Sequence, residues 1–229
     1  IFGRNNARWF DEYGIDYFTR EVYDAFYPGY GDSWPMYFGS VAMTYEQASA
    51  RGLLVRQYDG NVLTYPYTIR NHFVTSLSTA EAVAVNRQKF LNEFYNYRAS
   101  AIEEGKKDSI RSYVLPTQTD QAAANKLVGL LVRQGVEVGR ADSSFSACGK
   151  SYEPGAYVIN TAQPAKRFIR TMLDVNVPMT NDFLAEQERK RAKDLPDDIY
   201  DVTAWSMPLM MNVEMDACSR TVTGSLSRL

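Results

Sequence analysis

The fold of the second half of the chain is decided by Ser112-Tyr-Val-Leu115, residues 120–134 and Val136-Glu-Val138. The first and last of these segments are short and apolar, which is typical of buried strands, and the middle one has helical spacing. Ala156-Tyr-Val-Ile159 predicts a further strand. Because a strand–helix–strand order favours a right-handed crossover between parallel strands, the sequence predicts a small parallel-sheet α/β domain over residues 111–229.

The first hundred residues predict helices around a hairpin. Residues 6–26 carry apolar side chains close to helical spacing, and Asp59-Gly60 predicts a two-residue turn between two strands. Residues 68–98 predict a long helix. A division into two helices near Ser78 is the alternative, because Ser78-Thr-Ala-Glu81 fits a capping box. Residues 101–110 are polar, contain a glycine and lack apolar periodicity, so we expect a linker there between domains at 1–100 and 111–229.

The composition is that of a folded globular protein. The 229 residues are 45% hydrophobic and 23% charged, and the net charge of −2 gives no sign of a nucleic-acid partner. No apolar run approaches the length of a membrane span. Cys148 and Cys218 are the only cysteines, and their spacing alone leaves open whether they form a disulfide.

A loop rich in glycine, proline and aromatic residues begins at Phe26 and leads into an apolar segment, Ser40 to Tyr45. This segment predicts a buried strand, and Glu46 follows directly at its end. A carboxylate in that position is partly desolvated and rigidly held, which suits a general base. The alternative is a glutamate that only caps the next turn.

Two motifs in this region resemble a known family. Tyr27-Pro-Gly-Tyr-Gly-Asp-Ser-Trp-Pro35, followed by Ala42-Met-Thr-Tyr-Glu-Gln-Ala48, resembles the C-terminal part of the catalytic domain of bacterial zinc carboxypeptidases of the carboxypeptidase A type. The resemblance covers residues 1–100 and implies part of a mixed-sheet α/β/α domain. It implies that Glu46 is the catalytic general base, and it makes Tyr30 our preferred candidate for the tyrosine that binds the terminal carboxylate of the substrate.

A third motif, Ile199-Tyr-Asp-Val-Thr-Ala-Trp-Ser-Met-Pro-Leu209, resembles the glutamine amidotransferase-like domain appended to some members of that family. We expect this domain to be non-catalytic. Amidotransferase chemistry needs a cysteine nucleophile beside a base, and the second half of the chain contains no histidine. Gly149-Lys150-Ser151 is similar to the end of a phosphate-binding loop, but Ser144 stands where that loop needs glycine.

The resemblance implies zinc, yet the chain cannot complete the family's zinc site. Carboxypeptidase A, which is a standard example of the class, holds zinc with two histidines and a glutamate. This sequence has one histidine, His72, and no His-x-x-Glu pair. We expect His72 to be neutral and hydrogen-bonded inside the fold. The chain is therefore either the C-terminal part of a longer enzyme or a degenerate relative that binds no zinc.

Two functions follow as hypotheses. In the first, the chain belongs to a secreted or periplasmic zinc metallocarboxypeptidase that hydrolyses C-terminal peptide bonds. Its partners are then a peptide substrate and the upstream part of the same protein or a partner chain. In the second, the chain is a non-catalytic α/β binding or assembly protein that lacks zinc and uses the aromatic loop, residues 27–38, as a contact surface.

Overall fold

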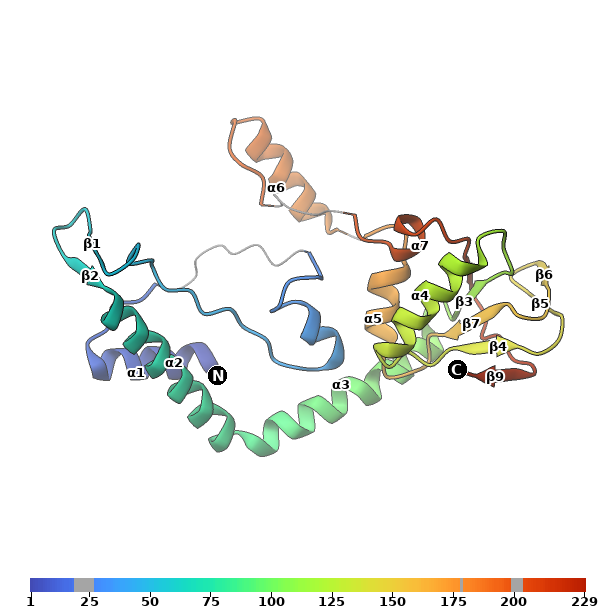
Figure 1. Cartoon of the computed structure of the whole chain (residues 1–229), viewed down its shortest axis with the longest axis horizontal. Helices are drawn as coiled ribbons and strands as arrows, with labels where there is room; N and C mark the ends of the chain where they lie inside the picture. Colours follow the sequence, from blue (N-terminus) through green and yellow to red (C-terminus); the bar gives the residue numbers. More distant parts are fainter. Residues whose placement is uncertain (19–26, 178, 199–203) are drawn as a thin grey trace. The chain divides into compact units, whose positions relative to one another are not determined.

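The computed structural model describes the chain except for residues 19–26, 178 and 199–203. The chain divides into two compact units (Figure 1). The first unit comprises Ile1–Tyr23 and Met43–Phe94, and the second comprises Asp24–Ala42 and Tyr95–Leu229. No helix within the described ranges is long and apolar enough to cross a membrane.

Helices and one hairpin form the described part of the first unit. Its elements are α1 (Phe2–Tyr13), β1 (Leu54–Arg56), β2 (Val62–Thr64), α2 (Tyr65–Val85) and the beginning of α3 (Arg87–Lys107). Gly14 ends α1 with a positive φ of 62°, a conformation that costs glycine little. Thr64 begins α2, because its hydroxyl accepts a hydrogen bond from the Tyr67 amide at 3.4 Å.

The predicted hairpin is confirmed, but its turn is longer than two residues. β1 and β2 are antiparallel, and Arg56 pairs with Val62, which leaves residues 57–61 in the loop. Gly60 has a φ of 89°, whereas Asp59 is not among the residues with positive φ. The Asp59 carboxylate instead accepts a hydrogen bond from the Asn61 amide at 3.0 Å. This side-chain contact supports the wider loop and explains the difference from the predicted type I′ turn.

The predicted long helix is two helices that meet at Asn86 rather than at Ser78. Ser78 and Glu81 lie within α2, so they form no capping box. The Ser78 hydroxyl donates to Asn6 of α1, and Glu81 accepts from Trp9 Nε1 at 2.6 Å. Hydrogen bonds from Trp9 and Asn5, together with the charge of Arg8, hold the pKa of Glu81 below its usual range.

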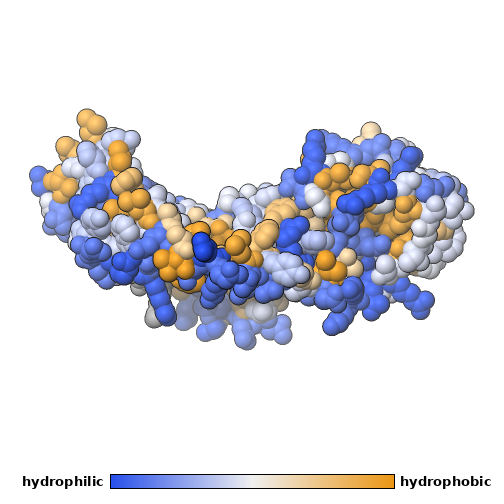
Figure 2. All heavy atoms as spheres, turned by 90° about the horizontal axis from the view of Figure 1, so that it is seen from below, coloured by the Kyte–Doolittle hydropathy of each residue, from blue (hydrophilic) through white to orange (hydrophobic). Residues whose placement is uncertain are grey.

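The burial pattern of α2 is the reverse of that expected for a helix in a water-soluble fold. Its buried side chains are largely polar: Thr68, Asn71, Thr75 and Ser78. Its exposed side chains include an apolar row at four-residue spacing, between 42% and 61% exposed, which we call the α2 stripe: Tyr65, Ile69, Phe73 and Leu77. Four-residue spacing places these side chains on one helix face. Figure 2 shows orange, apolar atoms open to solvent on the face that it draws.

The second unit contains most of the strands. Its elements are η1 (Trp34–Phe38), the end of α3, β3 (Ser112–Leu115), α4 (Gln121–Arg133), β4 (Gly139–Ala141), β5 (Phe145–Ala147), β6 (Lys150–Tyr152), β7 (Tyr157–Asn160), α5 (Lys166–Leu173), α6 (Asn181–Arg191), α7 (Met207–Met210), β8 (Asp216–Cys218) and β9 (Leu226–Arg228).

The main sheet has the strand order β8-β3-β7-β4-β9, and β5 and β6 form a separate hairpin. Every described strand pair is antiparallel, so the predicted parallel-sheet domain is wrong. β3 and β4 run in the same direction, but β7 lies between them and pairs with both. With α4 after β3 and α5 after β7, the order β8-β3-β7-β4 is that of the ferredoxin-like, split β-α-β arrangement.

The strands at the centre of this sheet are buried on both faces. Tyr113 and Leu115 of β3 face a core shared with α4 and α5, whereas Val114 faces a second core shared with Tyr152 and Val222. A strand buried on both sides is a near-continuous apolar run, which is the usual pattern of parallel strands. Here the β5–β6 hairpin and the segment after β8 cover the second face, so an antiparallel sheet acquires the same pattern.

The expected linker at 101–110 is helical as far as Lys107, because α3 continues through it. Gly105 on this helix lies against the backbone of residue 161, and a Cβ there would overlap the Thr161 carbonyl. The Thr161 hydroxyl in turn donates to the Gly105 carbonyl at 3.2 Å. The end of α3 is therefore a packed part of the second unit, which sequence polarity alone did not indicate.

A charged cluster fixes the residues that follow α3. Asp108 lies 3.0 Å from Lys166 and 2.5 Å from Arg170, both on α5, and its carboxylate accepts the Ile110 amide. Burial would raise the pKa of Asp108, but the hydrogen bonds from Lys166 and Ile110 and the charge of Arg170 outweigh it. The pKa of Asp108 is therefore held below its usual range.

Candidate functional site

Glu46, the expected general base, lies in irregular backbone and its side chain is exposed. The predicted strand over Ser40 to Tyr45 does not form, and the boundary between the two units falls inside it, at Ala42. In the described part of the first unit the sheet consists of β1 and β2 alone. A strand with no neighbour leaves its amides and carbonyls unpaired, which accounts for the irregular conformation.

Hydrogen bonds hold the backbone on both sides of Glu46 against α2. The Tyr45 and Thr79 hydroxyls are 2.6 Å apart, and Asn71 Nδ2 donates to Gln47 Oε1 at 2.6 Å. Asn71 is buried, and its Oδ1 has no hydrogen-bond partner among the described residues. The segment around Glu46 is thus anchored by polar side chains of α2, and Glu46 itself is exposed.

A pocket of about 560 Å³ opens next to this segment. Residues 47–52 form one wall and Tyr65, Thr68, Ile69 and His72 of α2 form the other. His72 is exposed on α2, so the expectation that it is enclosed in the fold is wrong. Together with Arg51 it gives the pocket an imidazole and a guanidinium, a set of groups that can bind a polar ligand.

The described residues do not fit a zinc site. No group of three or more histidine, cysteine, aspartate or glutamate side chains among them could hold a metal ion. A catalytic zinc needs three protein ligands, and His72 can supply only one of them. Any zinc in a functional assembly would therefore need ligands from outside the described residues.

Tyr30, the expected carboxylate-binding residue, belongs to the second unit, whereas Glu46 belongs to the first. The half-buried Tyr30 ring packs edge-on against Tyr27, with centroids 5.3 Å apart. Further along the loop, Trp34 and Phe38 each lie 5.0 Å from the Phe168 ring of α5. Much of the aromatic loop therefore contributes to the core of the second unit rather than forming an open contact surface.

The second unit contains a site that the sequence motifs did not indicate. A disulfide joins Cys148, in the turn between β5 and β6, to Cys218 at the end of β8. Such cross-links persist in extracellular and other oxidising compartments. Gly149-Lys150-Ser151 forms the turn and the start of β6, so it does not lead into a helix as a phosphate-binding loop does. Cys148 is a cross-link and not a nucleophile.

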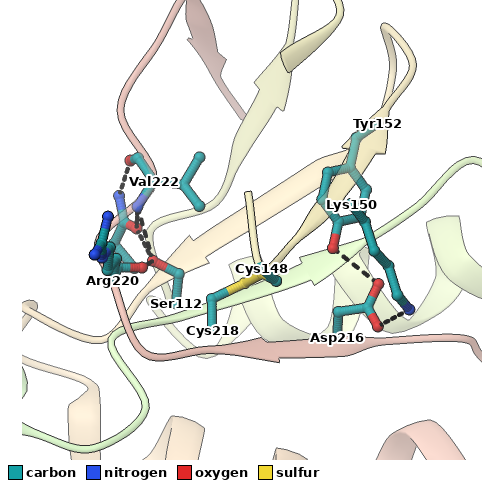
Figure 3. Close-up of a disulfide and its surroundings, with 9 residues drawn as sticks. Ser112, Cys148, Lys150, Tyr152, Asp216, Cys218, Arg220 and Val222 are labelled. Carbon is teal, nitrogen blue, oxygen red and sulfur yellow. Dashed lines mark hydrogen bonds and ion pairs between the residues drawn. A yellow bond between two sulfur atoms is a disulfide. The ribbon is translucent and has the colours of Figure 1, made fainter. Parts of the chain in front are cut away.

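Polar contacts surround this disulfide (Figure 3). Lys150 Nζ lies 2.5 Å from Asp216, and the Tyr152 hydroxyl donates to the same carboxylate at 2.9 Å. Burial and this hydrogen bond raise the pKa of Tyr152 to about 12. A pocket of about 650 Å³ lies between the β5–β6 hairpin and residues 218–223. In the sequence, the cysteine pair is the only feature that could have indicated this pocket.

Part of the amidotransferase-like motif, residues 199–203, lies outside the described residues. In the described part, Trp205 is buried and its Nε1 donates to the Thr171 carbonyl at 3.1 Å, so this end of the motif packs on α5. No family model, no curated protein and no solved structure matches this chain. The resemblances to zinc carboxypeptidases and to amidotransferase-like domains therefore stay predictions from the residues quoted above.

Proposed function

We propose that this chain forms the C-terminal portion of a zinc-dependent carboxypeptidase-like hydrolase that removes C-terminal residues from peptides. The assignment to this class rests on the motifs at 27–35 and 42–48. The observation that carries the proposal is the α2 stripe, an apolar row on α2 that no described residue of the first unit covers fully. A catalytic domain of which only one part is described would leave such a face.

The α2 stripe favours an additional layer of protein. Burying one large apolar side chain contributes roughly 1.5–3 kcal/mol, and contiguous exposed apolar patches are typical of interaction surfaces. The buried polar face of α2 is already occupied by α1 and by the segment around Glu46. We propose that the zinc-binding part of the same catalytic domain covers the stripe, as an upstream segment of the polypeptide or as a partner chain.

In this assembly Glu46 accepts a proton from water as the water attacks the scissile carbonyl. Its exposed carboxylate on an anchored segment is compatible with that task. Tyr30 is proposed to hold the terminal carboxylate of the peptide. The disulfide is consistent with a secreted or periplasmic location. Residues 111–229 are proposed to be a non-catalytic accessory domain.

The test is Glu46→Gln in the enzyme that contains the zinc-binding part. Glutamine has nearly the same size but cannot accept the proton, so kcat should fall roughly 10²–10⁴-fold, with zinc content and Tm unchanged. Glu93→Gln is the matched control, because Glu93 is an exposed glutamate of the same unit on α3. Normal kcat in Glu46→Gln would overturn the catalytic role and favour the alternative in which Glu46 only caps a turn.

A further inference from the structure

The pocket beside the disulfide has an unusual charge balance. Two cationic side chains, Lys150 and Arg220, are among its lining residues, and none of its described lining residues is acidic. Lys150 is neutralised by Asp216 at 2.5 Å. The exposed Arg220 guanidinium makes no ion pair with any residue that the structure describes. The pocket therefore presents one uncompensated positive charge.

Hydroxyl groups provide the other polar surface of this pocket. Five of the lining residues carry one: Ser146, Ser151, Ser219, Thr221 and Thr223. Within the described ranges, none of these five side chains forms a hydrogen bond to another part of the protein. Each hydroxyl can therefore donate to a ligand oxygen without first breaking a bond inside the fold.

The wall that carries Arg220 is held in place by buried polar groups (Figure 3). The Ser112 hydroxyl lies 2.6 Å from Asn160 Oδ1 and 3.1 Å from the Arg220 carbonyl, which share its proton, and it accepts from the Val222 amide at 3.0 Å. Ser112 is fully buried, and Asn160 Nδ2 donates to the Val222 carbonyl at 3.1 Å. The disulfide ties the two walls together. The backbone around Arg220 is thus fixed before a ligand arrives, which lowers the entropic cost of binding.

We propose that this pocket binds a small oxyanion, the carboxylate or phosphate group of a polar ligand, with Arg220 as the principal contact. A guanidinium presents two parallel N–H groups that match the oxygens of either group, and the surrounding hydroxyls can donate to the remaining oxygens. This binding site lies in the second unit and is independent of Glu46 and of the proposed peptidase activity.

The experiment is a titration of the full chain with inorganic phosphate and, separately, with acetate, both at low ionic strength. Amide NMR shifts are the readout. Saturable shifts confined to residues 146–151 and 219–223 are expected. Arg220→Gln should weaken binding about tenfold or more, since a hydrogen bond to a charged group is lost. Thr221→Val, which keeps the side-chain shape, should weaken it roughly threefold. Tighter binding of phosphate or of acetate identifies which oxyanion the site prefers.

Arg133→Gln is the matched control, because Arg133 is an exposed arginine at the end of α4, away from the pocket. It removes the same charge and should change the affinity less than twofold. Equal weakening by Arg133→Gln and Arg220→Gln would mean that the affinity depends only on the overall charge of the protein. That result would overturn the proposed site. An absence of saturable shifts, or an Arg220→Gln protein that keeps its Tm and binds normally, would also overturn it.

Discussion

The two units solve the problem of burying apolar surface in opposite ways. In the second unit, β3 and β7 lie between two apolar cores, and the largest fully buried side chains, such as Tyr113 and Phe168, belong to it. In the first unit, α2 buries polar side chains and exposes the α2 stripe. The comparison teaches that one chain can contain a unit with an apolar core on both faces of its sheet and a unit whose main helix exposes an apolar row.

The largest expected effect comes from removing the disulfide of the second unit. Cys148→Ser with Cys218→Ser deletes a disulfide that spans 70 residues, which should cost on the order of 2–4 kcal/mol in the free energy of unfolding. Hydrogen exchange should show the loss in β3 and β7 and no change in α2. Wild-type protein in reducing agent should behave like the double variant. An equal loss of protection in α2 would mean that the two units unfold together.

Two glycines offer a matched pair of intermediate size. Gly105→Ala places a methyl group against the Thr161 carbonyl and should destabilise the second unit by about 1–3 kcal/mol. Gly129 lies inside α4 with nothing within 4 Å of its would-be Cβ, so Gly129→Ala should stabilise the unit by roughly 0.5–1 kcal/mol. Urea unfolding measures both. A neutral or stabilising effect of Gly105→Ala would contradict the close contact between α3 and residue 161.

The smallest effect concerns pH. Because the pKa of Asp108 is lower in the folded state, its contribution is present above the unfolded value near 4 and disappears as pH falls through the folded value. Asp108→Asn should lower stability on the order of 1 kcal/mol at pH 7 and have little effect near pH 2. Urea midpoints at both pH values test this. Asp16 is an exposed aspartate of the first unit, so Asp16→Asn is the control. Its urea midpoint should change between the two pH values as much as that of the wild-type protein.

The sequence predicted individual helices and strands better than it predicted which strands pair with each other. Ser112 to Leu115, the helix after Asp120 and the hairpin at Asp59-Gly60 are present, because spacing and turn chemistry act over a few residues. The pairing of β3 with β7 depends on which strand enters between β3 and β4, and local patterns do not carry that information. Burial on both faces then made antiparallel strands look parallel.

The site residues show the same limit. Ser78 and Glu81 have the spacing of a helix cap, but their partners come from α1, more than 70 residues earlier in the sequence. The strand predicted before Glu46 does not form, and within the described first unit the only strands are β1 and β2, so a short apolar run was not sufficient to predict it. The Arg220 pocket forms only because Cys148 and Cys218 meet across 70 residues, and two cysteines in a sequence cannot specify that geometry.

The position of Cys218 has a consequence for how the second unit is made. β3, α4, the β5–β6 hairpin and β7 are all synthesised before β8. Until β8 is made, β3 lacks one of its two neighbouring strands and the second face of the sheet is only partly covered. The cross-link can close only after Cys218 has been synthesised, and it needs an oxidising environment. The disulfide therefore acts as a final fastening, which becomes possible only when almost the whole unit has been translated.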